Sequence, residues 1–419
     1  MLASYVSEAL EQNHDLQVAA TRVDAAVAQA RIAGAALLPS LNAPLDGARR
    51  RQNFIGFPIP AASNEVLSSM TSTYGASLSA SWELDLWGRL RAGKSAAAAD
   101  LQASLADMEA ARLSLIAQTT RAFFAALEST GQVRLSESTV ENLRLASEQI
   151  RERYTRGLRP SLDLRLALSN EATAAAVLQQ RLRARDAALR QLELLLGRYP
   201  AATIPTGELL PSLPPAVPVG LPADLISRRP DLIAAERRLA AAGARVTEAR
   251  RALYPRLSLT ASGGRSSSEL KDLLDGDFAV WNLVSNLTQP LFQGGRIRAG
   301  IDLAGATTEQ AMIRFVQSAL RAFGEVEAAL AAEHYLARQE LSLRSAAAEA
   351  GAGHTLASER YAQGLADMIT LLEAQRRAFA ADSQLLLVRR QRIDARIDLH
   401  LALGGDFGSM AVADRESTE

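Results

Sequence analysis

Residues Tyr74–Leu86 read YGASLSASWELDL, and this stretch decides which fold the chain can adopt. Every second residue from Tyr74 is apolar, whereas the residues between them are glycine, serine, glutamate or aspartate. Alternation with a period of two predicts a β-strand with one apolar and one polar face. The strand would be much longer than the typical length of about five or six residues. Its length and alternation suit a membrane strand, apolar toward lipid and polar toward a water-filled lumen.

A looser copy of this pattern lies at residues 279–291, AVWNLVSNLTQPL. The tryptophans Trp82, Trp87 and Trp281 all lie in or at the end of the two stretches, which suits an aromatic belt at the membrane interface. A soluble sheet with one wet face is the alternative for one strand taken alone. Four strands cannot close a barrel, and an open sheet edge has no hydrogen-bond partner in lipid. If the strands enter a membrane, several chains must therefore share one barrel.

The next residues, Gly88–Ser95, read GRLRAGKS and fit the nucleotide-binding pattern G-x-x-x-x-G-K-[ST]. A P-loop NTPase is therefore an alternative function. Such a loop follows a buried parallel strand with a continuous apolar run, but the preceding strand alternates. The related stretch GRIRAGID at 295–302 lacks the lysine and serine. We therefore interpret the shared G-R-[LI]-R-A-G as a junction between a membrane strand and a helix, with six junction residues: Gly88, Arg89, Gly93, Gly295, Arg296 and Gly300.

The whole chain is one unit that has been duplicated. RYTRGL at 153–158 matches RYAQGL at 360–365 with the same shift of 207 positions that relates the two junctions. LPSL at 38–41 matches YPRL at 254–257 with a shift of 216, so the first copy is longer by nine residues. Each copy is predicted to contain a helix, two strands, a long helix and a shorter helix.

Prolines mark the boundaries, because proline breaks a helix interior at a cost of about 3 kcal/mol. Seven of them fall between Pro200 and Pro222, which predicts an extended linker. The predicted divisions are a first repeat at 1–197, a proline-rich linker at 198–221, a second repeat at 222–404 and a tail at 405–419, with barrel strands at about 40–87 and 256–292. The opening helices are expected at 2–37 and 223–253.

The long helix of each copy is expected to have about 65 residues, or about 100 Å at 1.5 Å per residue. In the first copy Leu101, Leu105, Met108, Ala111 and Leu115 step by four and three, which predicts a coiled-coil seam. We therefore predict a layer of long helices that run side by side. A soluble coiled-coil scaffold is the third candidate function, and the strand pattern argues against it.

The composition gives no sign of an enzyme, a cofactor or a metal site. The chain has 46 basic and 46 acidic residues, so it lacks the basic excess typical of nucleic-acid binding. It contains no cysteine, and its four histidines have no metal-binding spacing. We predict that the protein is not an enzyme, binds no metal or nucleic acid, and needs no cofactor.

The chain resembles the TolC/OprM-like outer-membrane efflux proteins, also called outer membrane factors, of the NodT type. The resemblance spans nearly the whole chain and rests on WELDLWGRLR at 82–91, on ISRRPDL, AERRLAAA and YPRLSL between 226 and 259, on LTQPLFQGGRIRAG at 287–300, and on RYAQGLADMITLLEAQR at 360–376. It implies a homotrimer in which each chain gives four strands to a twelve-stranded outer-membrane barrel and the helices form a periplasmic tunnel. It also implies a passive efflux duct that works with a periplasmic adaptor and an inner-membrane transporter, often of the resistance-nodulation-division type.

The resemblance also assigns roles to residues. The adaptor-docking tip corresponds to the glycine turns, Gly157, Leu158, Gly364 and Leu365. Gate positions correspond to Asp163 and Tyr361, which link neighbouring coils in the closed state, and to the constriction residues Ile369, Glu373 and Arg376. Ala366 stands where the family has a further gate arginine.

The three constriction positions share one helix face, so threefold symmetry would arrange them as an apolar, an acidic and a basic ring. The alternative is a solvated face on which Glu373 pairs with Arg376 or Arg377.

The resemblance places the protein in the outer membrane, with its tunnel in the periplasm. The first residues, MLASYVSEALEQNHD, lack the basic start and apolar core of a secretory signal. Many family members carry a signal peptide and a lipidated cysteine, and we expect that the leader is absent from this chain. The sequence leaves lipid anchoring, and therefore a lipoprotein, open.

Overall fold

The computed structural model describes residues 1–54, 67–207, 209–213 and 228–405, which fall into two units. The sheet unit comprises Val23–Ser104 and Ala235–Arg314. The helical unit comprises Met1–Arg22, Leu105–Ala234 and Phe315 to the C-terminus. The predicted tail beyond residue 405, most of the second half of the predicted linker, and the predicted helix start at 223–227 lie outside the described residues.

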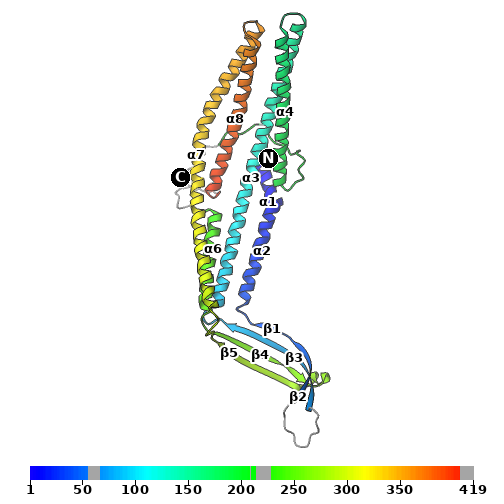
Figure 1. The fold of residues 1–419 in the computed structure, drawn as a ribbon, viewed down its shortest axis with the longest axis vertical. Coiled ribbons are helices and arrows are strands. Elements are labelled where there is room, and N and C mark those ends of the chain that lie inside the picture. Colours follow the sequence, from blue (N-terminus) through cyan, green and yellow to red (C-terminus); the bar gives the residue numbers. More distant parts are fainter. Residues whose placement is uncertain (55–66, 208, 214–227, 406–419) are drawn as a thin grey trace, which may run out of the picture. The chain divides into compact units, whose positions relative to one another are not determined.

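The sheet unit contains four antiparallel strand lines (Figure 1). The strands are β1 (Ser40–Asn42), β2 (Leu45–Phe54), β3 (Leu67–Leu84), β4 (Arg256–Ser267) and β5 (Ala279–Thr288), in the order β1-β3-β4-β5, with β2 also paired to β3. β1 and β2 pair with β3 in one continuous register, since Asn42 lies opposite Ser79 and Leu45 opposite Ala76. They are one strand line interrupted at Pro44, whose nitrogen has no proton to donate.

The register of the strands gives the sheet one apolar and one polar face. Residues directly opposite each other share a face. One row of partners is Leu41, Ala80, Ala261 and Leu283, and a parallel row is Leu84, Leu257 and Leu287. The neighbouring row, one residue farther from the helices, lies on the other face. It consists of Asn42, Ser79, Ser262 and Asn282. The alternation predicted from Tyr74–Leu86 therefore extends to the neighbouring strands, with exceptions such as Val284 on the polar face and Arg265 on the apolar face.

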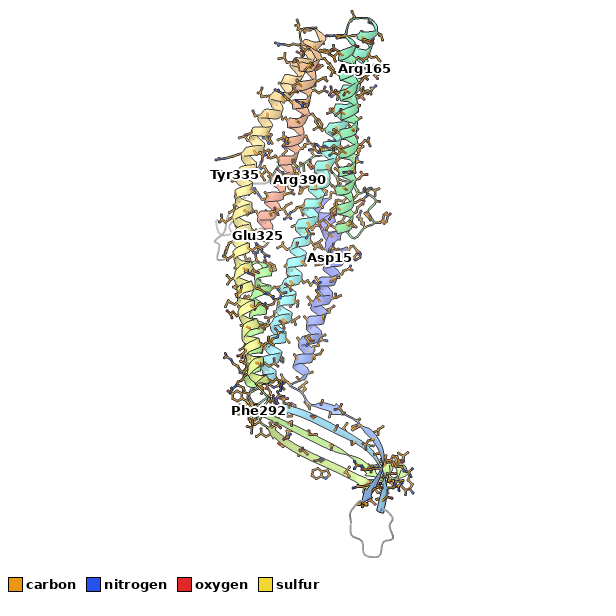
Figure 2. The ribbon with its side chains drawn as sticks, in the orientation of Figure 1. Asp15, Arg165, Phe292, Glu325, Tyr335 and Arg390 are labelled. Carbon is orange, nitrogen blue, oxygen red and sulfur yellow. The ribbon has the colours of Figure 1, made fainter. Side chains whose placement is uncertain are left out.

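The apolar face has no cover from other described residues. Trp281 is 83% exposed, and Leu283 and Leu287 are also largely exposed. Between β5 and the next helix, Leu291 and Phe292 are exposed too (Figure 2). Among the described helices, none combines the length and the hydropathy needed to cross a membrane.

Long helices make up the rest of both units. Helices α3 (Arg89–Thr155) and α7 (Arg296–Ala362) have 67 residues each, close to the predicted length. α6 (Pro230–Arg251) lies beside the start of α3 in the sheet unit, where Arg245 forms an ion pair with Asp100. In the predicted leucine seam of α3, Leu115 is buried, Leu105 is 46% exposed, and the three other residues are half-buried. Small residues of α3 are also buried, among them Ala92, Ala96 and Ala103.

The predicted helix at residues 2–37 is two helices, α1 (Leu2–Gln12) and α2 (His14–Ala35). Asn13 between them has an extended backbone, with φ −67° and ψ 124°. Its side-chain oxygen accepts a hydrogen bond from the Leu16 N–H at 3.1 Å, which is the N-cap geometry. The helix breaks here because asparagine competes for the backbone donors that a continuous helix would use.

The duplication is visible in the packing of the helical unit, which also contains α4 (Ser161–Leu195) and α8 (Met368–Ala402). The Asn13 amide donates to the Leu195 carbonyl, at the end of α4, at 3.0 Å. Arg229 donates to the Ala402 carbonyl, at the end of α8, at 3.1 Å. The two shifts found in the sequence relate these two contacts, so both repeats fasten their paired helices in the same way.

A buried glutamate fixes the chain that follows α4. Glu193 is almost fully buried, and its carboxylate accepts hydrogen bonds from three backbone N–H groups, those of Ala202, Thr203 and Ile204. The Tyr5 hydroxyl on α1 donates to the Pro205 carbonyl at 2.8 Å. The first part of the predicted linker is therefore packed against the helical unit.

Candidate functional site

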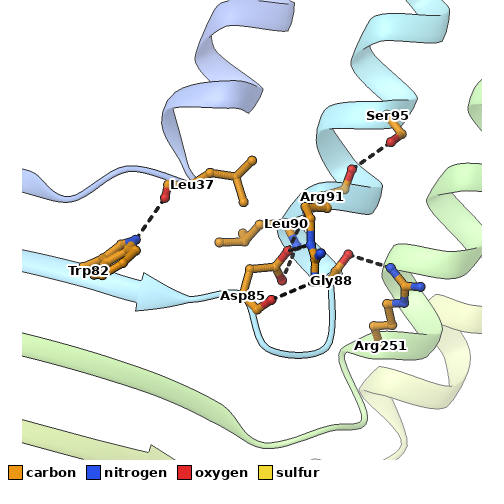
Figure 3. Close-up of polar contacts among 8 residues, drawn as sticks. All are labelled: Leu37, Trp82, Asp85, Gly88, Leu90, Arg91, Ser95 and Arg251. Atoms are coloured by element: carbon orange, nitrogen blue, oxygen red, sulfur yellow. Dashed lines mark hydrogen bonds and ion pairs between the residues drawn. The ribbon is translucent and has the colours of Figure 1, made fainter.

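The strand-to-helix junction after β3 is organised by Asp85 (Figure 3). Its carboxylate accepts hydrogen bonds from the backbone N–H groups of Leu90 at 3.0 Å and Arg91 at 2.9 Å. Burial raises the pKa of Asp85, but these N–H donors and the Arg91 guanidinium outweigh it and hold the pKa below its usual range. An ionised carboxylate at the first turn of α3 satisfies donors that the helix itself leaves unpaired.

Gly88 makes the turn between the strand and the helix. Its φ is +77°, a left-handed conformation that favours glycine. Its carbonyl accepts a hydrogen bond from Arg251 of α6 at 2.7 Å, and a Cβ at this position would lie 2.6 Å from the same guanidinium nitrogen. Arg89 forms an ion pair with Glu83 at the end of β3 at 2.8 Å. A Cβ at Gly93 would lie 3.1 Å from the Glu248 carboxylate, so glycine at this position permits close contact between α3 and α6.

This geometry excludes the nucleotide-binding alternative. Residues from Arg89 onward are already helical, so Lys94 and Ser95 lie inside α3 and not in a loop. The Leu90 and Arg91 N–H groups, which would face a phosphate, bind Asp85. The Ser95 hydroxyl donates to the Arg91 carbonyl at 2.9 Å (Figure 3). The P-loop alternative is therefore rejected, because an acidic side chain already occupies the place of the phosphate.

The second junction, between β5 and α7, also turns at glycine but has no acidic side chain that caps the helix. Gly294 and Gly295 have φ of +55° and +83°, and α7 begins at Arg296. Phe292 occupies the position that corresponds to Asp85. Gly300 has open space where a Cβ would lie. The two copies therefore share the glycine turn and differ in how the helix start is capped.

The two helical tips end in the same hydrogen-bonded turn. Leu158 N–H donates to the Arg153 carbonyl and Leu365 N–H to the Arg360 carbonyl, both at 2.8 Å. Gly157 and Gly364 have φ of +73° and +78°, as the left-handed residue of a Schellman motif requires. Leu158 and Leu365 are largely exposed. The four predicted tip residues thus lie in two exposed turns, two residues in each.

The predicted gate residues Asp163 and Tyr361 are brought together through a third residue, Arg159. The Arg159 guanidinium lies over the Tyr361 ring, 4.6 Å from its centroid, and 3.9 Å from the Asp163 carboxylate. Burial raises the pKa of Tyr361, and the nearby Arg159 charge partly offsets this. The prediction from sequence missed Arg159. The shift of 207 pairs it with Ala366, so the internal repeat contained the signal that could have found it.

The three predicted constriction residues lie on one face of α8. Glu373 forms ion pairs with Arg376 at 2.6 Å and Arg377 at 2.9 Å. Hydrogen bonds from Arg377 and Arg376 hold the pKa of Glu373 below its usual range. These are the pairs expected of a solvated face, and Ile369 beside them is exposed.

A groove of about 530 Å³ runs between α8 and the pair α3 and α4, and Ile369, Glu373 and Arg376 line it. Ile369 and Glu373 also line a second groove, bordered by α7 and the tip turn at Leu365. The constriction face of α8 therefore forms a ridge between two open grooves.

Comparison with known proteins identifies the family to which the chain belongs. The profile of the outer membrane efflux protein family matches residues 5–198 and 221–405. The chain belongs to this family. It is 36% identical over 412 residues to the outer membrane protein OprJ of Pseudomonas aeruginosa, with 97% of this chain and 84% of OprJ covered. It is 33% identical over 414 residues to the toluene efflux pump outer membrane protein TtgF of Pseudomonas putida, with 98% and 84% covered.

A solved structure agrees. The CmeC outer membrane channel of Campylobacter jejuni superposes with a TM-score of 0.91 at 25% identity, over 99% of this chain and 88% of CmeC. The chain is therefore an outer-membrane efflux channel, mainly helical with membrane β-strands, and it is located in the outer membrane. Its relatives are channel proteins and not enzymes. The predicted fold class, function and location are confirmed.

Proposed function

We propose that three copies of the chain share one twelve-stranded barrel and form the passive outer-membrane duct of a tripartite efflux pump. The observation that carries this proposal is the two-faced sheet with open edges. In the described part of the chain, the β1–β2 line and β5 pair on one side only. Unpaired backbone groups are too costly in lipid, so each edge needs a strand from another copy.

The dimensions of the apolar face support the same arrangement. It extends along β3 from Leu84 to about Tyr74, which is about 34 Å at 3.4 Å per residue. At the tilt of about 45° usual for membrane strands, this length spans about 25 Å, the height of the lipid-facing band of a barrel. Trp82 donates to the Leu37 carbonyl at the helix end of the sheet, and Tyr74 lies at the loop end of the band. Trp281 lies between these ends, opposite Gly263. The aromatic residues thus occupy both ends of the band.

The polar face then lines the pore. Serine, threonine, asparagine and glycine form most of it, with Val280 and Val284 of β5 among them, Glu83 at its helix end and Asp46 toward its loop end. A wall made mostly of small, uncharged polar groups suits a water-filled duct for varied small molecules such as drugs and toxic compounds. The energy for export would come from an inner-membrane transporter, of the resistance-nodulation-division type, joined to the duct by a periplasmic adaptor.

The tips of the helical unit are the proposed adaptor site and gate. Gly157, Leu158, Gly364 and Leu365 form two matching exposed turns, and exposed leucines at a polar turn suit contact with a second protein. The face bearing Ile369, Glu373 and Arg376 would narrow the tunnel when three copies meet. The ion pairs of Glu373 then link the proposed acidic and basic rings.

The test uses protein extracted from outer membranes in detergent. Light scattering, corrected for detergent, should give a mass of three chains, and the trimer should form discrete channels in planar bilayers. A monomer that stays soluble after detergent removal and opens no channels contradicts the proposal. A trimer that forms channels but supports no efflux with any adaptor and transporter pair contradicts the pump assignment alone.

A further inference from the structure

The two tip turns carry a tyrosine at the same position, and only one of the two is buried. Tyr154 and Tyr361 both lie three residues before the turn glycine. Tyr154 is 41% exposed, whereas Tyr361 is 7% exposed. Because the two tyrosines occupy corresponding positions of the repeats, the difference depends on the residues that pack against each ring.

Arg159 supplies that difference. It belongs to the turn between α3 and α4, and its counterpart in the turn between α7 and α8 is Ala366. The Arg159 guanidinium covers the Tyr361 ring at 4.6 Å and donates a hydrogen bond to the Tyr361 carbonyl at 3.4 Å. Alanine at 366 has no group that could cover Tyr154 in return.

The Arg159 side chain is well placed to hold the end of α7. Tyr361 lies in the last turn of α7, where the terminal carbonyls give the helix end a partial negative charge that favours a cation. Its carbonyl also accepts a hydrogen bond from the Gly364 N–H at 3.1 Å. Arg159 is about four-fifths buried, and Asp163 lies 3.9 Å from it on the next turn of α4. The Tyr361 hydroxyl is buried without a hydrogen-bond partner among the described residues, so polar contacts to this residue come through its ring and carbonyl.

Apolar side chains also join the two hairpin tips. A small apolar cluster lies beside the pair, formed by Ile150, Ala167, Ala357, Tyr361, Met368 and Leu371. Ile150 and Ala167 come from the α3–α4 hairpin and the other four from α7 and α8. Arg159 is a charged residue of this junction that reaches across both hairpins, and Arg153 near the end of α3 also lies close enough to Tyr361 to lower its pKa.

We infer that Arg159 is a one-sided latch, a positioning residue that holds the tip of the α7–α8 hairpin against the α3–α4 turn. The inference rests on the proposed function, because it assigns the latch to the proposed gate. Releasing the latch frees the α7–α8 hairpin, which carries Ile369, Glu373 and Arg376. The closed arrangement is then less favoured, and the channel opens more often.

The test is single-channel recording of the purified full-length channel in planar bilayers. Arg159→Ala should raise the open probability about tenfold, the effect expected from losing a largely buried cation–π contact and a charge-assisted hydrogen bond. Arg159→Lys keeps the charge but loses the planar stacking, so it should give an intermediate value. The matched control is Arg156→Ala, which removes an exposed arginine of the same turn that pairs with Glu152, and it should behave as wild type.

A double-mutant cycle separates the latch from a general loosening of the tip. Tyr361→Ala should act like Arg159→Ala, and the double variant should add nothing further, since both remove the same contact. Fully additive effects would overturn the latch.

The outcomes also distinguish this inference from the proposed function. If Glu373→Ala with Arg376→Ala opens the channel while Arg159→Ala does not, the gate stands and the latch is wrong. If the wild-type protein forms no channels, the proposed function itself fails. Should Arg159→Ala not assemble, Arg159→Lys carries the test, and a wild-type open probability in that variant counts against a role for ring stacking.

Discussion

Asp85 and Arg91 hold the strand-to-helix junction together through three hydrogen bonds. The Asp85 carboxylate accepts from the Arg91 backbone N–H at 2.9 Å and from its Nε at 3.2 Å. Arg91 Nη2 donates to the Asp85 carbonyl at 3.1 Å. The aspartate thus caps the first turn of α3 and is itself fixed by that turn, so the last residues of the strand and the first residues of the helix form one rigid corner.

Replacing Asp85 with alanine should destabilise this corner by about 1–2 kcal/mol, the usual range for loss of an N-cap. The folded pKa of Asp85 is depressed, so its contribution is present above the unfolded pKa and is lost as pH falls through the folded pKa. Thermal unfolding in detergent should show a lower midpoint for Asp85→Ala at neutral pH and a smaller difference below the usual carboxyl range. Asp302→Ala, at an exposed position near the start of α7, is the control. Equal effects of both variants would contradict the cap.

The two faces of the sheet predict opposite effects for one substitution at neighbouring positions. Leu283 lies on the apolar face of β5 and Asn282 on the polar face. Arginine at Leu283 would face lipid near mid-membrane, which costs about 2–4 kcal/mol per chain. Leu283→Arg should therefore reduce the amount of channel in outer membranes several-fold, whereas Asn282→Arg should preserve it. Immunoblots of membrane fractions measure both, and equal levels would show that the face assignment is wrong.

The parts of the fold that sequence predicts well are those with a local signal. The alternation of Tyr74–Leu86 defines the strand faces, and the glycines at 88, 157 and 364 mark turns because they adopt left-handed φ. Each of these signals depends on the residues next to it, so no knowledge of the tertiary structure is needed. The duplication adds a second, independent copy of each signal.

Other features depend on which helices pack together, and local sequence patterns do not reveal these contacts. The break at Asn13 is a local choice between a helix and a cap, which the contact with Leu195 helps to decide. Which residues of α3 are buried also depends on its neighbours, since Ala103 is buried whereas Leu105 is 46% exposed. Arg159 acts on a tyrosine 202 residues away, so its role is visible only once the two tips lie side by side.

A buried carboxylate should dominate the stability of the helical unit. Glu340 on α7 is 8% exposed and forms ion pairs with Arg392, with Arg344 at 2.8 Å and with Arg389 at 3.4 Å. Burial raises its pKa, but Arg392 and Arg344 outweigh this and lower it. Glu340→Gln would leave three guanidinium groups without their carboxylate, at a cost of about 3 kcal/mol.

The pH dependence of this variant has a definite sign. Since the folded pKa is depressed, the stabilisation by Glu340 is present above the unfolded pKa of about 4.3 and is lost as pH falls through the folded value. The unfolding midpoint of Glu340→Gln should therefore lie well below wild type at pH 7 and approach it in acid. Glu349→Gln, at an exposed position on the same helix, should match wild type throughout. A difference that persists unchanged in acid would rule out the ion pairs as its cause.

The constriction can be tested against an ion pair of the same geometry elsewhere. Replacing Glu373 and Arg376 with alanine should raise single-channel conductance, because it removes the bulk and the charge proposed to narrow the tunnel. The control replaces Glu141 and Arg144 on α3, another exposed pair spaced i,i+3 and 2.8 Å apart. If both double variants change conductance alike, or neither does, the constriction does not lie at Glu373.

The tip turns predict a loss of efflux that leaves the channel assembled. Gly364 has φ +78° and open space around it, so Gly364→Glu places a charged side chain at the proposed adaptor surface without a clash inside the chain. The left-handed backbone adds about 1–2 kcal/mol of strain, small for a trimer with an extensive helical unit. Drug-efflux assays in cells should show lost export with normal trimer levels. Gly351→Glu, within α7 and also in open space, should export normally, and normal export by Gly364→Glu would place the docking site elsewhere.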